Sequence, residues 1–282
     1  MTGIFPLSSR TTKQALTYLI LGIVTTFILL PEVWLLVTSL KRNTEYLSPQ
    51  LTFLPAVPQW ANYAQVFTMI PFFNYVRNSL VLGASFTTLC VMSSSLAGYA
   101  FARIQAPGKN LLFSIVIALL MIPAIVTVIP QFVIFSQLGL TGTYWPWVLW
   151  GIGGSSFHIF LFRQFFMAFP RELEEAAELD GCSPFRVFLE IFLPNAQPVL
   201  ATSAILNFMW VWSDWFNPLI FLSDANTTLA VKLNYAYVTP QGQQLTPVVL
   251  AACVLYVLAP VAMFFFGQKY ILQGVVTTGL KG

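Results

Sequence analysis

The acidic residues of this chain are clustered closely enough to form a charged binding surface. Six of its ten acids fall between residues 172 and 190, in a segment that begins R-E-L-E-E-A-A-E-L-D-G. Carboxylates gathered on a short helix suit a basic groove on another protein, because complementary charge steers and orients association. The same segment could instead be an amphipathic hairpin at the membrane surface, although an anionic leaflet would repel its glutamates.

Covalent and metal chemistry have few candidates here. The single histidine, His158, excludes a multi-histidine metal site, and Cys90, Cys182 and Cys253 show neither metal nor disulfide spacing. The frames G-x-x-x-x-G-K-[S/T], G-x-S-x-G and H-E-x-x-H are absent. We therefore expect no catalytic residue, no metal site and no cofactor in this chain, and we do not expect it to be an enzyme.

The composition shows what surrounds these residues. Of the 282 residues, 57% are hydrophobic and only 8% are charged, whereas a soluble domain carries roughly a quarter charged residues. Lipid must therefore cover most of the surface. The net charge of +3 is small and its basic residues are scattered, which argues against a nucleic-acid partner. The chain is predicted to be an all-α membrane protein.

Six apolar segments are long enough to cross a bilayer. A helix needs about 20 residues to span roughly 30 Å of hydrocarbon. Segments of about that length lie near residues 15–39, 79–101, 111–135, 143–166, 198–222 and 247–267. We expect a cytoplasmic segment at 1–14, a six-helix transmembrane domain at 15–267 and a cytoplasmic tail at 268–282.

The distribution of basic residues sets the expected orientation. With both termini in the cytoplasm, nine lysines and arginines lie inside and four lie outside, as the positive-inside rule requires. The loops at 40–75 and 223–246 are then extracytoplasmic, and neither is long enough for a soluble domain.

The acidic loop at 167–197 is predicted to fold as helix, turn, helix. Gly181 suits the stop of the first helix, on which Leu173, Ala176, Ala177 and Asp180 share one face. Ser183 and Pro184 suit the cap and first residue of a second, amphipathic helix. We expect Pro194 to end that second helix.

At these residues the sequence resembles a known family. Glu175-Ala176-Ala177, Asp180-Gly181 and Leu193-Pro194 resemble the EAA loop of the membrane subunits of bacterial ABC importers. Further segments resemble the carbohydrate-uptake, maltose-type permeases within that group, and the resemblance runs from about residue 30 to the end: 97–103, 107–109, 121–123, 163–166, 212–218 and the C-terminal tail.

The resemblance implies a permease subunit in the bacterial cytoplasmic membrane. Its expected partners are a second homologous permease, two cytoplasmic ATPase subunits that hold ATP and magnesium, and an extracytoplasmic solute-binding protein. The expected cargo is a carbohydrate or related polyol. The first helix of the loop would be the coupling helix, and Lys281 and Gly282 could enter the ATPase interface. The residues expected to couple to the ATPase are Glu174, Glu175, Ala176, Ala177, Asp180 and Gly181.

Four residues of the fifth span are candidates for the substrate path. Asn207, Trp210 and Ser213 could stack on and hydrogen-bond a sugar, and an ionisable Asp214 inside a span is a functional candidate because its burial is costly. The segment 212–218 resembles the W-N-D-F-x-x-P stretch of the family, which implies a helix break and gate element. Packing between helices is the alternative reading for Asp214.

Two other classes of function compete with the importer subunit. An ATP-independent secondary transporter or channel subunit needs no ATPase, but such transporters usually carry internal repeats and an ion-coupling residue pair, which this sequence lacks. A membrane-embedded enzyme would need a nucleophile, a dyad or a metal cluster, and none is evident.

Overall fold

The computed structural model describes residues 10–50 and 52–279, and the side chains of 13–50 and 52–269. Within this part the chain is helical, apart from loops and an isolated β-bridge between Val238 and Gln244. The predicted all-α class is confirmed. Contacts divide the chain into unit 1 (1–70 and 235–256) and unit 2 (71–234 and 257–282), with the boundary inside the last helix.

Unit 1 is built on the first long helix and on a folded loop. It contains α1 (Arg10–Ser39), α2 (Asn43–Tyr46), α3 (Ala61–Met69) and the start of α15 (Thr246–Gly279). The buried Asn62 amide donates to the carbonyls of Ser39 and Lys41 at 2.7 and 2.9 Å, which fixes the turn after α1. Most of the apolar side chains of α1 between Leu16 and Leu36 are exposed, a surface that requires lipid or a partner helix.

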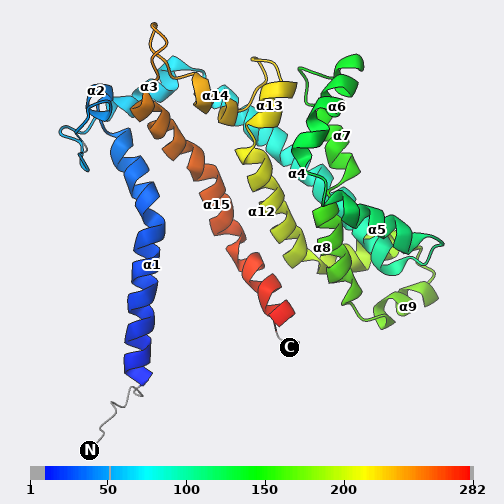
Figure 1. Ribbon diagram of the computed structural model, residues 1–282. Coiled ribbons are helices and arrows are strands. Elements are labelled where there is room, and N and C mark those ends of the chain that lie inside the picture. The colour runs from blue at the N-terminus through cyan, green and yellow to red at the C-terminus, as the bar shows by residue number, and fades with distance from the viewer. Residues whose placement is uncertain (1–9, 51, 280–282) are drawn as a thin grey trace, which may run out of the picture. The chain divides into compact units, whose positions relative to one another are not determined.

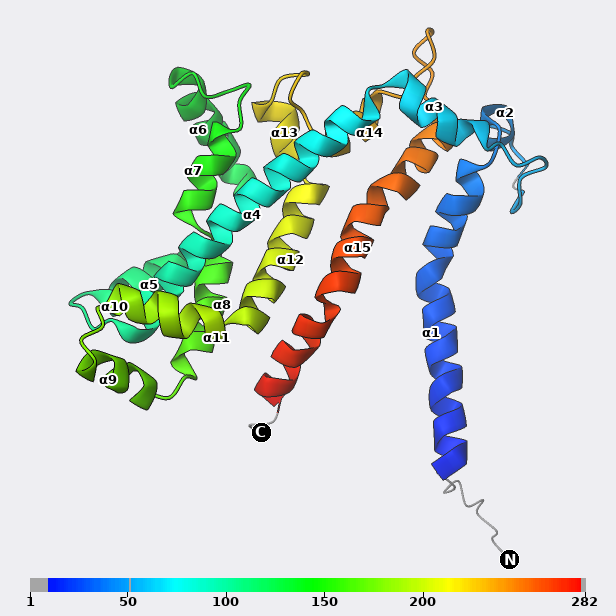
Figure 2. The ribbon, with the colours of Figure 1, turned by 180° about the vertical axis from the view of Figure 1, so that it is seen from behind.

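Unit 2 is organised around α4 (Phe72–Arg103), which packs against α7 (Trp145–Gly153), α8 (Ser156–Met167) and α12 (Gln197–Ser213), as Figures 1 and 2 show from opposite sides. Small residues allow the close approach. A methyl group at Gly98 would lie 2.5 Å from Cβ of Phe162 on α8. The remaining helices of unit 2 are α5 (Lys109–Leu119), α6 (Ala124–Gln137), α9 (Glu172–Leu179), α10 (Pro184–Val187), α11 (Leu193–Asn195), α13 (Phe216–Phe221) and α14 (Leu229–Tyr235), with a π-turn, η1, at Phe188–Phe192.

Three described helical segments are long and apolar enough to cross a membrane by themselves: Lys13–Ser39, Phe72–Arg103 and Thr246–Lys269. The pair α5 and α6, bent by 100°, adds a fourth if it counts as one span. Each of the predicted spans at 111–135, 143–166 and 198–222 is divided into two helices in the structure. The division of the last one falls at Asp214, where the resemblance of 212–218 implies a helix break. The second predicted span also starts earlier, at Phe72.

Each division has a physical cause. Pro123 is extended (φ −60°, ψ 128°) and lacks an N–H, so α5 ends before it and α6 begins after it. Gly154 has φ +70°, a conformation that favours glycine, and it separates α7 from α8. Asp214 is extended between α12 and α13. Its Oδ1 accepts from the backbone N–H groups of Phe216 and Asn217, each at 3.1 Å.

Pro194 does not end the second helix of the acidic loop, contrary to prediction. It lies within α11, which follows the π-turn directly. The Leu193 N–H bonds the carbonyl of Phe188, five residues back. A hydrogen bond between residues five apart defines a π-bulge. The residue after this bond is Pro194, which has no N–H to contribute.

The last helix runs on from the predicted sixth span through Gly279, so it includes residues assigned from sequence to the tail. Lys281 and Gly282, and residues 1–9 of the predicted N-terminal segment, lie outside the described residues.

Candidate functional site

The helix α9 ends in a Schellman motif, as its glycine predicts. Gly181 has φ +78°. Its N–H bonds the carbonyl of Glu178 at 3.0 Å, and the N–H of Cys182 bonds that of Ala177 at 2.9 Å. The following Ser183 accepts a hydrogen bond from the Arg186 N–H and caps α10. The helix, turn and second helix start are therefore confirmed at these residues.

The predicted common face of α9 is divided in the structure. Ala177 is only 6% exposed and belongs to an apolar cluster that includes Tyr99, Phe166, Phe188 and Phe192. Leu173, Ala176 and Asp180 are exposed. Ala177 therefore packs against its own chain, and a larger residue there would first disturb this cluster.

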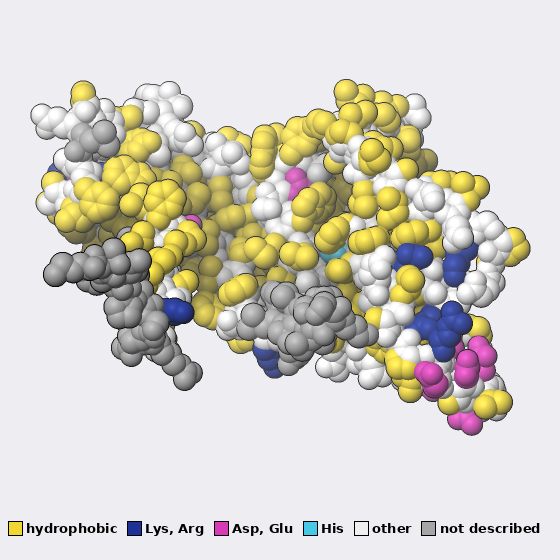
Figure 3. Space-filling view, turned by 60° about the horizontal axis from the view of Figure 1, so that its bottom comes forward, with side chains coloured by type: hydrophobic (Ala, Val, Ile, Leu, Met, Phe, Trp, Pro, Cys, Tyr) yellow, Lys and Arg dark blue, Asp and Glu magenta, His cyan; other side chains and the backbone are white. Residues whose placement is uncertain are grey.

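The outward surface of α9 is mostly acidic, and Leu179 is its most exposed apolar side chain. Glu175, Ala176, Glu178, Asp180 and Gly181 are exposed. In Figure 3 the acidic side chains of this part gather beside a group of basic ones. Leu179 is 90% exposed, and sequence analysis missed it because a leucine at a helix end carries no signal of its direction. The exposed surface offers carboxylates and an apolar anchor to a partner.

Glu174 differs from its acidic neighbours. Its Oε2 lies 3.7 Å from Nη1 of Arg103, and its side chain is 20% exposed. Burial raises the pKa of the Glu174 carboxyl above its ordinary value, while the Arg103 guanidinium acts in the opposite direction. This predicted coupling residue is therefore engaged within the chain.

A cavity of about 440 Å³ brings together two of the predicted path residues, Asn207 and Trp210. Phe86 and Cys90 of α4 line it from one side, and His158 of α8 contributes its ring. His158 Nδ1 lies 2.7 Å from the Ser203 hydroxyl. The cavity thus combines aromatic rings with an amide, an imidazole and the hydroxyl of Ser155, the groups that stack on and hydrogen-bond polar ligands.

A second cavity of about 390 Å³ also includes Trp210 in its lining. Its polar groups are Thr127 and Gln131 of α6 and Asn217 of α13. The Trp210 side chain, 54% exposed, therefore borders two hollows of unit 2 that are mostly apolar and contain a few polar groups. Sequence analysis gave no signal for Gln131, because a lone glutamine in an apolar segment does not reveal which neighbour it faces.

The other two predicted path residues lie differently. The Ser213 hydroxyl donates to the carbonyls of Met209 and Trp210 on its own helix. Both carboxylate oxygens of Asp214 accept hydrogen bonds, Oδ1 from two backbone N–H groups and Oδ2 from the Asn217 amide at 2.8 Å. Asp214 thus caps α13. Their role in the path stays a prediction.

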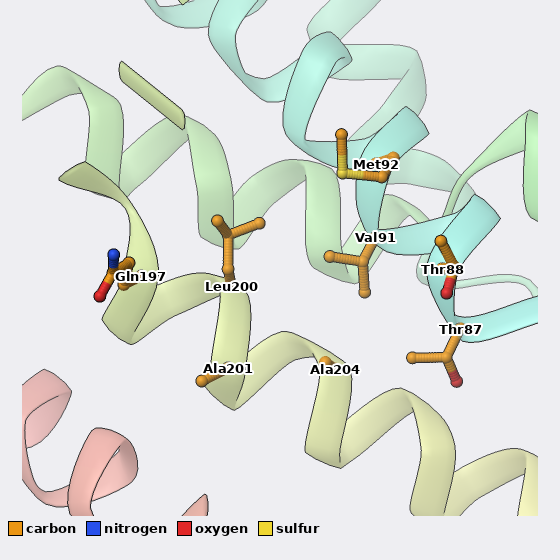
Figure 4. Close-up of a pocket in the computed structure, with 8 residues that line it drawn as sticks. All are labelled: Thr87, Thr88, Val91, Met92, Gln197, Leu200, Ala201 and Ala204. Atoms are coloured by element: carbon orange, nitrogen blue, oxygen red, sulfur yellow. The ribbon is translucent and has the colours of Figure 1, made fainter. Parts of the chain in front are cut away.

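A third hollow, about 470 Å³ in volume, lies between α4 and α12 and is mostly apolar. Figure 4 shows Thr87, Thr88, Val91 and Met92 of α4 facing Leu200 and Ala204 of α12. Thr87 also donates a 3.5 Å hydrogen bond to Oδ1 of Asn207. Thr87 lines this hollow and Asn207 lines the first cavity, so this hydrogen bond between α4 and α12 connects the two.

Comparison with known proteins identifies the family. Residues 91–276 match the family described as binding-protein-dependent transport system inner membrane component. The chain belongs to this family. The resemblance stated from the EAA loop is therefore confirmed, and the protein is an integral membrane permease with several spans.

Curated relatives extend over most of the permease. An arabinooligosaccharide transport system permease protein of Bacillus subtilis is 32% identical over 262 residues, covering 90% of this chain and 91% of the relative. A sulfoquinovosyl glycerol transport system permease protein of Agrobacterium fabrum is 30% identical, covering 98% and 97%. The sn-glycerol-3-phosphate permease protein of Pectobacterium atrosepticum is 30% identical, covering 83% and 85%.

A solved structure shares the fold. A chain of a bacterial ABC transporter involved in the import of the acidic polysaccharide alginate superposes with a TM-score of 0.80 at 20% identity, covering 95% of this chain and 100% of that one. The arrangement of helices described above is thus the fold of an ABC importer permease.

Proposed function

We propose that this chain is the membrane-spanning permease subunit of an ATP-driven ABC importer for a carbohydrate or a related polyol. The observation that carries the proposal is the family match together with relatives that transport arabinooligosaccharides and sulfoquinovosyl glycerol. The cavities beside Trp210 fit such a cargo, because an aromatic ring and amide side chains suit the apolar faces and hydroxyl groups of sugars.

The proposed assembly contains a second homologous permease, two cytoplasmic ATPases and an extracytoplasmic solute-binding protein. Six spans cross the membrane if α5–α6, α7–α8 and α12–α13 each count as one. The excess of basic residues on one side favours cytoplasmic termini. ATP and magnesium belong to the ATPases, and no residue of this chain is assigned to bind them.

In this assembly α9 is the coupling helix. Its exposed carboxylates and Leu179 contact the ATPase, whose closure on ATP moves the helix. The motion reaches Asn207 and Trp210, which line the path, through α4, α8 and α12. Ser213 and Asp214 belong to the segment 212–218, which we assign as the gate element. Asp214 caps the first turn of α13 in this segment.

The test is reconstitution of the four-component importer in proteoliposomes, with ATP hydrolysis and uptake measured for a panel of sugars and polyols. We expect one of them to stimulate hydrolysis and to accumulate only with ATP and the binding protein. Trp210→Ala should lower uptake while the ATPase still co-purifies. The matched control is Trp145→Ala, 53% exposed and outside both Trp210 cavities.

Uptake by this chain without any ATPase would contradict the proposal and favour the secondary transporter or channel. Equal uptake by wild type and Trp210→Ala would leave the importer assignment in place but remove Trp210 from the path.

A further inference from the structure

Arg103, the last residue of α4, connects the membrane helices of unit 2 to α9. Its side chain is only 7% exposed. Nη2 donates to the carbonyls of Phe166 and Phe169 at 2.8 and 2.5 Å, and Nη1 lies 3.7 Å from the Glu174 carboxylate. The guanidinium also lies over the Phe192 ring, 5.1 Å from its centroid. One side chain thus contacts the end of α8, the turn after it, α9 and η1.

The contacts use properties that distinguish arginine from lysine. The last carbonyls of a helix have no partner within the helix, and α8 ends at Met167. A planar guanidinium with five N–H groups can serve two carbonyls and a carboxylate at once, and it keeps its charge at all relevant pH values. A positive charge is also favourable at a helix C-terminus. Burial shields these interactions from salt.

The orientation of α9 depends on few contacts. Ala177 is the one buried residue of this helix of eight residues, and it fixes a single apolar point. A helix held at a single point can pivot about it. The pair between Arg103 and Glu174 adds a second point, three residues away along the helix, and two points fix the direction of the axis.

We propose that Arg103 is a positioning residue that makes α9 move as one body with α4 and α8. The inference rests on the proposed coupling role of α9 and adds the part that transmits its motion. α4 and α8 contribute Phe86, Cys90 and His158 to the cavity beside Trp210. A displacement of α9 by the ATPase therefore reaches the cavity lining. Without the Arg103 contacts, α9 stays docked but pivots, and the motion is not passed on.

The distance between α9 and α4 tests this directly. Nitroxide labels are placed at Glu172→Cys on α9 and Leu96→Cys on α4, in a chain whose three native cysteines are replaced by serine. The distribution of distances between the two labels is measured by pulsed electron paramagnetic resonance in the assembled complex, before and after trapping with ATP and vanadate. In the otherwise wild-type chain we expect one narrow distribution that does not change on trapping.

Two variants remove the link in different ways. Arg103→Gln removes the charge and most of the donors, whereas Glu174→Gln leaves the bonds from Arg103 to α8 intact. Both should broaden the distribution and shift it on trapping, while the ATPase co-purifies at wild-type yield. If Arg103→Gln does not accumulate, Glu174→Gln alone decides.

The chain offers matched controls. Arg163 lies 4.0 Å from the Phe113 ring centroid and donates to the carbonyl of Phe101, so Arg163→Gln removes an arginine that joins membrane helices without contacting α9. Glu190→Gln breaks a pair with Arg186 at 2.8 Å, four residues apart in the loop. Both should keep the narrow distribution.

A narrow, unshifted distribution in Glu174→Gln would overturn the proposal, and so would broadening in both controls. Failure of the ATPase to co-purify with the wild-type chain would instead contradict the proposed coupling role itself, so the two failures are distinguishable.

Discussion

Leu179 projects almost its whole side chain from α9, which is an unfavourable state for a leucine in water. Burying such a side chain contributes about 1.5–3 kcal/mol. The surrounding exposed residues are Glu175, Glu178 and Asp180, so an approaching basic surface would meet an apolar anchor with charge around it. An apolar side chain ringed by charges suits a docking point, because a few buried residues supply most of the affinity of an interface.

Replacing Leu179 by serine should therefore weaken ATPase association without affecting membrane insertion. The loss of about 1.5–3 kcal/mol corresponds to about 10- to 150-fold in affinity. The measurement is co-purification of the ATPase with membranes that hold equal amounts of permease. Leu189→Ser, at a half-exposed leucine of η1, is the control, and equal yields for the two variants would exclude Leu179 as the anchor.

Among the elements, α4 depends most on close contact. Glycines lie at three of its contacts with other helices. Gly83 and Gly98 of α4 face Phe208 of α12 and Phe162 of α8, respectively. At the third contact, Gly151 of α7 faces Leu89 of α4. At Gly98 an added methyl meets backbone atoms of Ile159 and Arg163 as well as a side chain. Backbone atoms cannot move aside as the end of a flexible side chain can, so the helices would have to separate.

Gly98→Ala should thus lower stability by about 1–3 kcal/mol, the range of overpacking. Thermal unfolding of the purified permease in detergent checks it. Gly153→Ala serves as the control, because among the described residues no atom outside its own stretch of helix lies within 4 Å of a methyl group added there. This variant should unfold at the wild-type temperature. An equal midpoint for Gly98→Ala would show that α4 and α8 are less tightly packed than described.

Local chemistry predicts much of the acidic loop from sequence, and tertiary contact explains what escaped. Gly181 and Ser183 act through their own backbone and side chain, so their roles as stop and cap are readable without a fold. The direction of Ala177 depends on where Tyr99 and Phe188 lie, which no local pattern contains. The break at Gly154 is similar: the Ser94 hydroxyl of α4 accepts from the N–H of Ser155 at 3.0 Å, a bond from a distant helix.

For the whole molecule, the exposed apolar surface favours insertion into the membrane, and the charge distribution favours one orientation there. The helix α1 exposes its apolar residues along most of its length, as a lipid-facing span does. The basic residues near the ends of the predicted spans favour one side of the membrane. The expected orientation thus depends on the basic residues of all the loops together and not on those of any single loop.

Reporter fusions test this orientation. A reporter joined after Arg171, directly before α9, should be active in the form that requires the cytoplasm, and one joined after Asn226, between α13 and α14, in the form that requires export. The reason is the nine-to-four count of basic residues together with six spans. The reversed pattern would place α9 on the side that holds no ATP.

The π-turn at Phe188–Phe192 sets the rotational phase of the chain between α9 and α12. A π-turn takes one residue more than an α-turn, which corresponds to about 100° of rotation for everything after it. With that extra residue, Phe188 and Phe192 both point into the apolar cluster, at 2% and 0% exposure. Substitution of the exposed Leu189 leaves this phase unchanged. Deletion of a single residue from the turn would instead rotate α10 relative to α12 and turn Val187 and Phe188 away from the cluster.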